Sequence, residues 1–215
     1  MIPMPTPEAL LAFTLASVLL IVVPGPSVLF VIGRSLAYGR RGGLVSVLGN
    51  ELGALPLVAA VAFGLGAIVA QSVLVFTIIK MLGAVYLVYL GVQAIRHRRD
   101  GGAGTSETSG RALTPLVMLR QGFIVGVTNP KTIVFFVAVL PQFVSFEAGA
   151  VPLQMMLLGL VFVTVAFVSD AAWALLAGTA QAWFARSPRR LSAIRATGGG
   201  LMIGLGGGLA LTGSE

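Results

Sequence analysis

The sequence contains no cysteine and a single histidine, His97. Disulfides and thiolate metal sites are therefore excluded, and one histidine among arginines gives no metal-ligand spacing. Charged residues are also scarce, at 10% of the chain, against about 25% in a typical soluble domain. The chain has no phosphate-binding loop of the GxxxxGK[ST] kind, so we expect no intrinsic ATP hydrolysis and no nucleotide cofactor.

Apolar residues dominate what is present. Hydrophobic residues make up 57% of the 215 residues, and the mean hydropathy is +0.99. Because a membrane span needs roughly 20 apolar residues, the length suffices for about six spans and leaves no room for a separate soluble domain. The composition predicts an all-α membrane protein. The net charge of +7 then indicates basic cytoplasmic loops and not a nucleic-acid surface.

Six apolar segments can be drawn. We expect the first to be a span and not a cleaved signal, because no basic residue precedes it and its apolar run is too long. Residues 98–111, rich in Gly, Ser and Thr, predict a flexible cytoplasmic loop. The predicted spans are about Pro7 to Gly33, Gly43 to Ala70, Val73 to Ile95, Leu116 to Val144, Val151 to Phe184 and Ile194 to Leu211.

The distribution of basic residues predicts the orientation. With six spans, the loops after the first, third and fifth spans share one side and hold the loop arginines, whereas the other side has Glu8, Glu147 and Glu215. The positive-inside rule makes the basic side cytoplasmic, so both termini are expected outside. The basic residues are Arg34, Arg40, Arg41, Arg96, Arg98, Arg99, Arg111, Arg120, Arg186, Arg189, Arg190 and Arg195.

The two halves of the chain, about 1–97 and 112–215, share a pattern. A basic residue is followed by glycines three and eleven positions later in both the third and the sixth spans, as Lys80, Gly83, Gly91 and as Arg195, Gly198, Gly206. Three spans per half predict inverted repeats, with broken helices in the first and fourth spans and a site near the midplane, as in secondary transporters. A chance match between glycine-rich segments is the alternative.

Only Glu51, Lys80, Lys131 and Asp170 are ionisable within the spans. A charge at the bilayer centre costs at least about 2.5–3.5 kcal/mol, so such residues face a cavity or a partner. They could line a functional site or merely pair to lock helices, and Lys80 could equally reach the interface. Small residues at four-residue steps put Asp170 on a face directed toward other helices. Trp173 lies one turn away and is expected to line the same cavity.

Prolines in the spans indicate that some helices are broken, which is a second feature of the predicted site. A helical proline leaves the carbonyl four residues earlier without its amide donor, so Pro24 and Pro26 would free the carbonyls of Leu20 and Val22. Pro130 would likewise free that of Gly126. Broken helices are tolerated in a bilayer where they are buried or line a wet cavity. Their amide ends can bind a carboxylate and their carbonyl ends a cation.

A zwitterionic amino acid fits this combination. Its carboxylate would suit Lys131 and the nearby amides, and its ammonium would suit Asp170 or Glu51 and freed carbonyls. A carboxylate that takes up a proton would also couple transport to the proton gradient.

At these residues the chain resembles the LysE/RhtB family of bacterial amino-acid exporters (the lysine exporter and homoserine–threonine efflux type). The resemblance implies a six-span inner-membrane protein that exports amino acids or derivatives in exchange for protons, and a homodimer. The matching motifs are Pro24-Gly25-Pro26, Gly49-Asn50-Glu51-Leu52-Gly53, KMLGAVYLVYLG from Lys80 to Gly91, Asn129-Pro130-Lys131, Phe135-Phe136, Leu140-Pro141-Gln142-Phe143, Asp170 and Trp173. The candidate substrate-binding residues are Pro24, Gly25, Pro26, Asn50, Glu51, Asn129, Pro130, Lys131, Asp170 and Trp173, with Asp170 and Glu51 as candidates for proton coupling.

Three alternatives remain open at this point. An ion or metal exporter or channel of the same superfamily is one, although a soft-metal site would favour Cys, His or Met ligands. A membrane-embedded enzyme would need a nucleophile and base or a metal set, which Glu51 and Asp170 alone do not provide. A structural membrane subunit would have no need of buried ionisable residues and broken helices.

Overall fold

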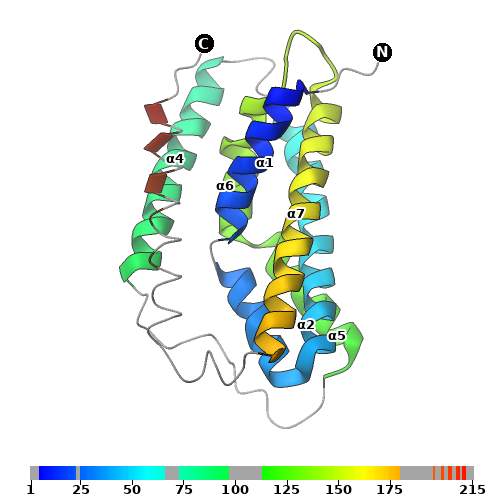
Figure 1. Ribbon diagram of the computed structural model, residues 1–215. Helices are drawn as coiled ribbons and strands as arrows, with labels where there is room; N and C mark the ends of the chain where they lie inside the picture. Colours follow the sequence, from blue (N-terminus) through cyan, green and yellow to red (C-terminus); the bar gives the residue numbers. More distant parts are fainter. Residues whose placement is uncertain are drawn as a thin grey trace.

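The computed structural model describes residues 5–22, 25–65, 73–96 and 113–179, with a few positions between 196 and 211. These residues form helices and turns and no strand (Figure 1). The predicted loop 98–111 and most of the predicted sixth span lie outside them. The elements are α1 (Pro7–Val22), α2 (Pro26–Ala60), the π-helical turn η1 (Val61–Leu65), α4 (Val73–Arg96), α5 (Pro115–Val127), α6 (Pro130–Ala138), the 3-10 turn η2 (Leu140–Phe143) and α7 (Val151–Thr179).

Helix α2 is a hairpin of two helical arms. Gly39, between the two arms, has φ +70° and ψ −178°, which interrupts the helix. Val31 and Val47, equally far from Gly39, meet in one buried cluster with Ala174. In a straight helix these two residues would be about 24 Å apart. The chain therefore reverses at Gly39, and the second arm runs back along α7 and α5 (Figure 1).

By length and apolar composition, two of the described helices can cross a membrane, Pro26–Gly64 and Val151–Ala177. There are up to three if the bent pair of α5 with α6 and η2 counts as one span, and α1 is a shorter apolar helix. Because Pro26–Gly64 reverses at Gly39, it does not cross as one straight rod. The chain is thus a helical protein of membrane type, and the count of six spans stays a prediction.

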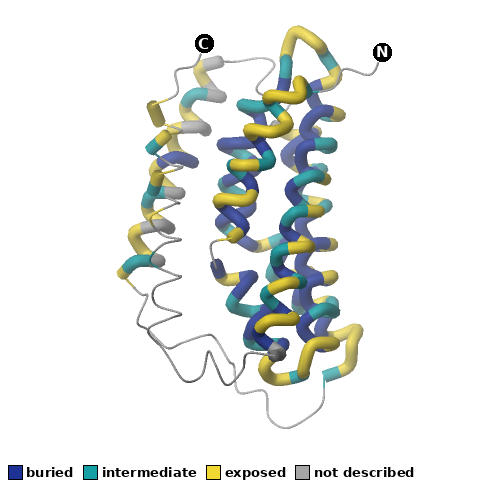
Figure 2. Tube along the Cα trace, in the orientation of Figure 1, coloured by how far each residue is buried: buried dark blue, intermediate teal, exposed yellow. Residues whose placement is uncertain are grey.

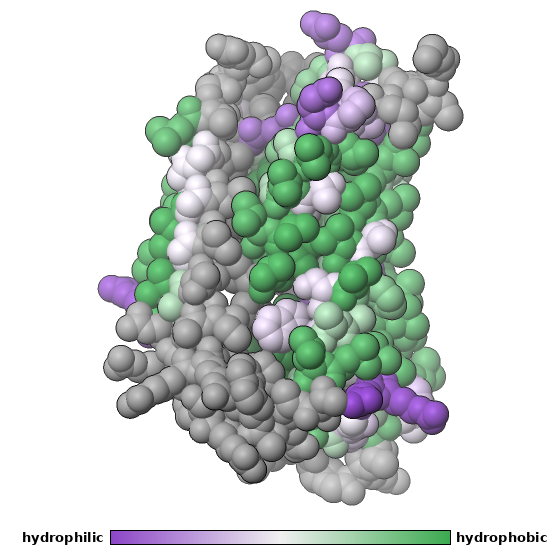
Figure 3. Space-filling model, in the orientation of Figure 1, coloured by the Kyte–Doolittle hydropathy of each residue, from purple (hydrophilic) through white to green (hydrophobic). Residues whose placement is uncertain are grey.

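The outer surface is apolar where a bilayer would contact it. Leu11, Phe63 and Val168 are 62%, 66% and 64% exposed. Figure 3 shows a broad hydrophobic belt with hydrophilic residues gathered toward the two ends of the bundle. Such a continuous apolar surface is compatible with lipid and not with water. Buried residues follow the inward faces of α2, α6 and α7 (Figure 2).

An aromatic cluster fills the core between α1, α6 and α7. Phe13 and Phe135 have ring centroids 5.7 Å apart, and Phe136 meets Phe162 edge to face at 4.8 Å. All four side chains are at most 3% exposed. Edge-to-face and tilted contacts of this kind add directional preference to hydrophobic burial. The cluster therefore holds α6 firmly against α1 and α7.

Backbones touch where the second arm of α2 crosses α5. A Cβ atom added to Gly122 or Gly126 would overlap the carbonyl oxygens of Ser46 and Asn50, respectively. Glycines at four-residue spacing allow such close approach of membrane helices. On the facing helix, Gly49 and Gly53 meet the carbonyls of α5 in the same way. The crossing thereby fixes the position of Asn50.

The predicted internal repeat is only half described. On α4, a Cβ added to Gly83 would overlap the side chain of Ala138 on α6, so this glycine permits close packing. The counterparts proposed for Lys80, Gly83 and Gly91 lie outside the described residues; they are Arg195, Gly198 and Gly206. The inverted-repeat architecture therefore stays a prediction.

Candidate functional site

The chain breaks between α5 and α6 at the predicted proline. The two segments bend by 43°, and Pro130 occupies the first turn of α6, where no amide donor is needed. Asn129 caps α6, because its Oδ1 accepts the Lys131 amide at 3.2 Å. The carbonyl of Gly126, which Pro130 was expected to free, accepts the Asn129 amide at 3.3 Å. That carbonyl is satisfied within the turn.

The other break separates α1 from α2. Helix α1 ends at Val22 and α2 begins at Pro26, and Pro24 lies outside the described residues. The Leu20 carbonyl, predicted to lose its helical donor to Pro24, accepts a hydrogen bond from Lys131 Nζ at 2.9 Å. Lys131 is only 4% exposed. A buried lysine on one broken helix thus satisfies a carbonyl freed by the other break.

A second hydrogen bond joins the two breaks. Asn129 Nδ2 donates to Ser27 Oγ at 3.0 Å, and both residues are buried. Gly25 lies beside the Lys131 side chain, with its position for a Cβ 3.5 Å from Nζ. The beginnings of α2 and α6 are therefore held together by polar contacts in the interior.

The acidic residues lie on the second arm of α2 and on α7. Asn50 Nδ2 donates to Glu51 Oε1 at 2.9 Å and to Asp170 Oδ2 at 3.4 Å, so one amide bridges α2 and α7. Asn50, Glu51 and Asp170 are at most 6% exposed. Among the described residues Asn50 Oδ1 has no hydrogen-bond partner. An unsatisfied buried acceptor costs free energy, so this oxygen is suited to receive a donor from a bound molecule.

These groups share one small cavity. The centres of water molecules can occupy about 20 Å³ of this cavity. That space suits one or two waters and not an amino acid. Its polar lining contains five of the predicted site residues. The lining residues are Ile21, Ser27, Val28, Asn50, Glu51, Ala54, Gly126, Asn129, Lys131, Thr132, Phe162, Ala166 and Asp170.

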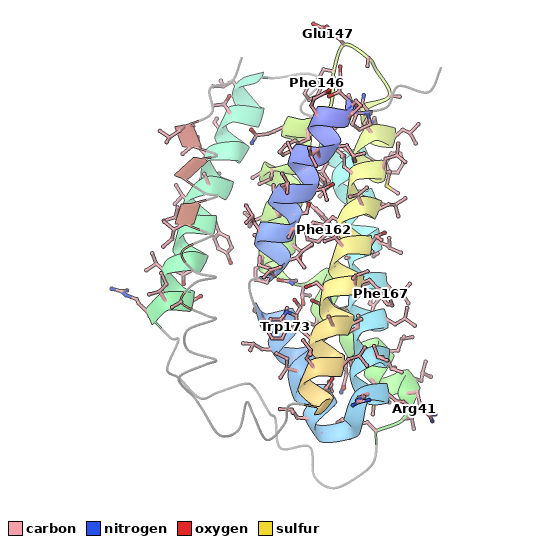
Figure 4. The ribbon with its side chains drawn as sticks, viewed as in Figure 1. Arg41, Phe146, Glu147, Phe162, Phe167 and Trp173 are labelled. Carbon is pink, nitrogen blue, oxygen red and sulfur yellow. The ribbon has the colours of Figure 1, made fainter. Side chains whose placement is uncertain are left out.

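The remaining predicted residues lie around the cavity. Gly25 contacts Lys131, and Pro26 and Pro130 begin their helices. Trp173, half-buried, packs against Val28, Ile32 and Ala177 and is not part of the lining. Figure 4 shows it farther from the Glu147 end of the bundle than Phe162.

Sequence reasoning did not find Ser27, Thr132 or Phe162 as lining residues. A serine and a threonine after a proline carry no distinctive signal, and Phe162 reads as ordinary core. The glycines of α5 could have been found, because Gly122 and Gly126 have the spacing of close helix contacts.

Buried charged and amide groups around a cavity, between broken helices within an apolar shell, define a helical membrane protein with an internal polar site. The model of the family described as LysE type translocator matches residues 18–213. The chain belongs to this family, which consists of translocators and not of enzymes.

Curated relatives cover almost the whole chain. A protein of Vibrio cholerae named uncharacterized membrane protein is 35% identical over 91% of this chain and 93% of its own. The homoserine/homoserine lactone efflux protein of Salmonella typhimurium is 32% identical over 93% of this chain and 94% of its own. The leucine efflux protein of Klebsiella pneumoniae is 26% identical over 91% and 89%, respectively. No solved structure matches the chain.

Proposed function

We propose that this protein is a secondary transporter that exports amino acids or their derivatives across the bacterial inner membrane. The observation that carries the proposal is that side chains of opposite charge, Lys131 and the carboxylates Asp170 and Glu51, line one cavity. A zwitterion presents the complementary pair of charges. The names of two relatives, which export homoserine or its lactone and leucine, point to the same substrate class.

The proposed site includes the cavity residues Asn50, Glu51, Asn129, Lys131 and Asp170. The proline and glycine residues of the two breaks shape it, and Trp173 borders it. Substrate binds with its carboxylate toward Lys131 and its ammonium toward the carboxylates and a freed carbonyl. Because the described cavity is too small for an amino acid, binding requires the broken helices to move apart.

Proton antiport supplies the driving force in this proposal. Asp170 and Glu51 are joined through one amide of Asn50, so protonation of one carboxylate changes the charge that the other and the substrate ammonium meet. The chain crosses the membrane six times as two inverted repeats, with both termini outside, and works as a homodimer.

Counterflow in liposomes tests the transport function. Liposomes that contain the purified protein and are preloaded with unlabelled homoserine or leucine should accumulate the labelled compound. In a separate assay, an uncoupler should abolish efflux from preloaded cells. Asp170→Asn should abolish counterflow, because the amide keeps the side-chain shape and loses the charge. Full counterflow in that variant would reject Asp170, and no counterflow of any amino acid by the wild type would reject the proposed function.

A further inference from the structure

Lys131 places an ammonium group at the carbonyl end of α1. The Leu20 carbonyl is in the last turn of α1, and residue 24, which would donate to it in a continued helix, is a proline. The carbonyl end of a helix attracts cations through the helix dipole. Lys131 Nζ donates to this oxygen at 2.9 Å. A primary ammonium group therefore occupies the carbonyl end of the first broken helix.

The same side chain fills the space beside Gly25. Its Cδ, Cε and Nζ atoms lie 3.5–3.6 Å from the Cβ position of Gly25, which is van der Waals contact. Lys131 is 4% exposed. In the cavity beside it, the centres of water molecules can occupy only about 20 Å³. Withdrawal of this side chain would leave a space beside Gly25 that is long enough for a propylammonium ion.

We propose that the carbonyl end of α1 is an ammonium site, and that Lys131 occupies it as a tethered substitute when no substrate is bound. This inference rests on the proposed function. On entry, the ammonium group of the amino acid takes over the Leu20 carbonyl, and Lys131 Nζ turns to the substrate carboxylate. Lys131 thereby determines specificity, since only a ligand that bears both groups supplies a donor to the Leu20 carbonyl and a partner to the displaced Lys131 ammonium.

This exchange of ammonium groups, the handover, keeps the Leu20 carbonyl satisfied in both states. Without a donor, the Leu20 carbonyl would be unpaired in the interior, which is costly. An ammonium group from either source satisfies it. A static lock between α6 and α1 would explain the same hydrogen bond, but it would not exchange with a free ammonium ion or respond to substrate.

Chemical replacement of the lysine tests the ammonium site. Lys131→Ala removes the atoms from Cγ to Nζ, which together correspond to propylammonium. Thermal unfolding of the purified variant in detergent should shift upward by about 2–4 °C with saturating propylammonium chloride. The wild type, whose own ammonium occupies the site, should not shift. Tetramethylammonium, which has no N–H donor, and 1-propanol, which has no charge, should not shift the variant.

Lys80→Ala is the matched control, because Lys80 is the only other lysine in the chain. An equal response of both variants, or no response of Lys131→Ala, would overturn the ammonium site. If Lys131→Ala does not fold, its monodisperse yield after extraction replaces the melting temperature as readout. Propylammonium should then restore that yield and sodium chloride should not, and failure to restore it counts against the proposal.

The two lysines also make the handover observable. In protein labelled with ¹³C at lysine Cε, two methylene signals are expected, and Lys80→Ala assigns them. An amino acid that gives counterflow should move the Lys131 signal and leave that of Lys80 in place. A Lys131 signal that stays fixed with a transported amino acid would overturn the handover. Absence of counterflow would instead refute the proposed function and leave the propylammonium result standing.

Discussion

Asn129 joins the beginnings of α6 and α2 through one side chain. Its Oδ1 accepts the Lys131 amide and so begins α6, and its Nδ2 donates to Ser27 at the start of α2. An N-cap residue fixes both where a helix starts and in which direction its first side chains point. The position of Lys131, the second residue of α6, therefore depends on this cap.

Asn129→Ala should lower both stability and transport. The lost cap costs about 0.5–2 kcal/mol, and the buried Ser27 hydroxyl also loses its donor. Thr114→Ala is the matched control, because Thr114 caps α5 through the Val117 amide at 3.4 Å and is exposed. Thermal unfolding should register a cap loss in both variants, whereas counterflow should fall only in Asn129→Ala. Equal transport by the two variants would contradict a role for Asn129 in placing Lys131.

At the scale of single residues, the sequence predicted which carbonyls lose their helical donor better than it predicted which donors replace it. Covalent geometry alone identifies the Leu20 carbonyl as one that loses its donor to Pro24, and the structure pairs it with Lys131. The Gly126 carbonyl was identified by the same rule, but the Asn129 amide satisfies it in a local turn. Whether a freed carbonyl is met locally or from another helix depends on tertiary packing, which no single motif contains.

At the scale of elements, the contact between α2 and α5 fixes the position of Asn50, which donates to the two acidic groups. Gly126 faces the Asn50 carbonyl so closely that no Cβ fits between the two backbones. The backbone cannot move aside as a flexible side chain can. The separation of these helices is thus limited by the absence of side chains at a few positions.

Gly126→Ala should push α5 away from α2. Overpacking of this kind costs about 1–3 kcal/mol, and displacement of Asn50 should also reduce counterflow. Gly33→Ala serves as the control, since a Cβ there has nothing within 4 Å and alanine favours helix by up to about 1 kcal/mol. Melting temperatures in detergent should fall for the first variant and hold or rise for the second. A Gly126→Ala protein as stable as Gly33→Ala would argue against backbone contact at this crossing.

The hairpin of α2 depends on backbone conformation at one residue. Gly39 has φ +70° and ψ −178°, a region used almost only by glycine, and nothing lies within 4 Å of its Cβ position. Gly39→Ala should therefore destabilise the protein by about 1–3 kcal/mol through strain alone. Comparison with Gly33→Ala, which is equally free of steric contact, isolates this effect. A melting temperature equal to that of Gly33→Ala would show that the turn tolerates a side chain.

The sequence predicted the order of these elements and missed the form of their connection. Arginines and glycines between 34 and 42 indicate a loop, yet helical structure continues on both sides of a single turn residue. Hydropathy reports where apolar segments lie, whereas the exact turn is set by packing such as the burial of Val31 and Val47 in one cluster with Ala174. Such contacts appear only once the two arms are packed.

At the scale of the whole molecule, charge and hydropathy are segregated along one axis. The exposed Arg41, beside the α2 turn, and the exposed Glu147, in the loop before α7, lie at opposite ends of the bundle (Figure 4). An apolar belt separates these ends (Figure 3). The basic end is the one that the positive-inside rule assigns to the cytoplasm.

The absence of cysteine makes this orientation directly measurable. Ala37→Cys, near the α2 turn, and Ala148→Cys, in the loop before α7, both replace exposed alanines, so neither changes the charge that governs insertion. In cells with a permeabilised outer membrane, an impermeant maleimide should label Ala148→Cys. It should label Ala37→Cys only from inside-out vesicles, because a bilayer separates the two ends. The reverse pattern would place the basic end outside and contradict the proposed topology, whereas labelling of both positions from one side would show that the described helices do not span the membrane as proposed.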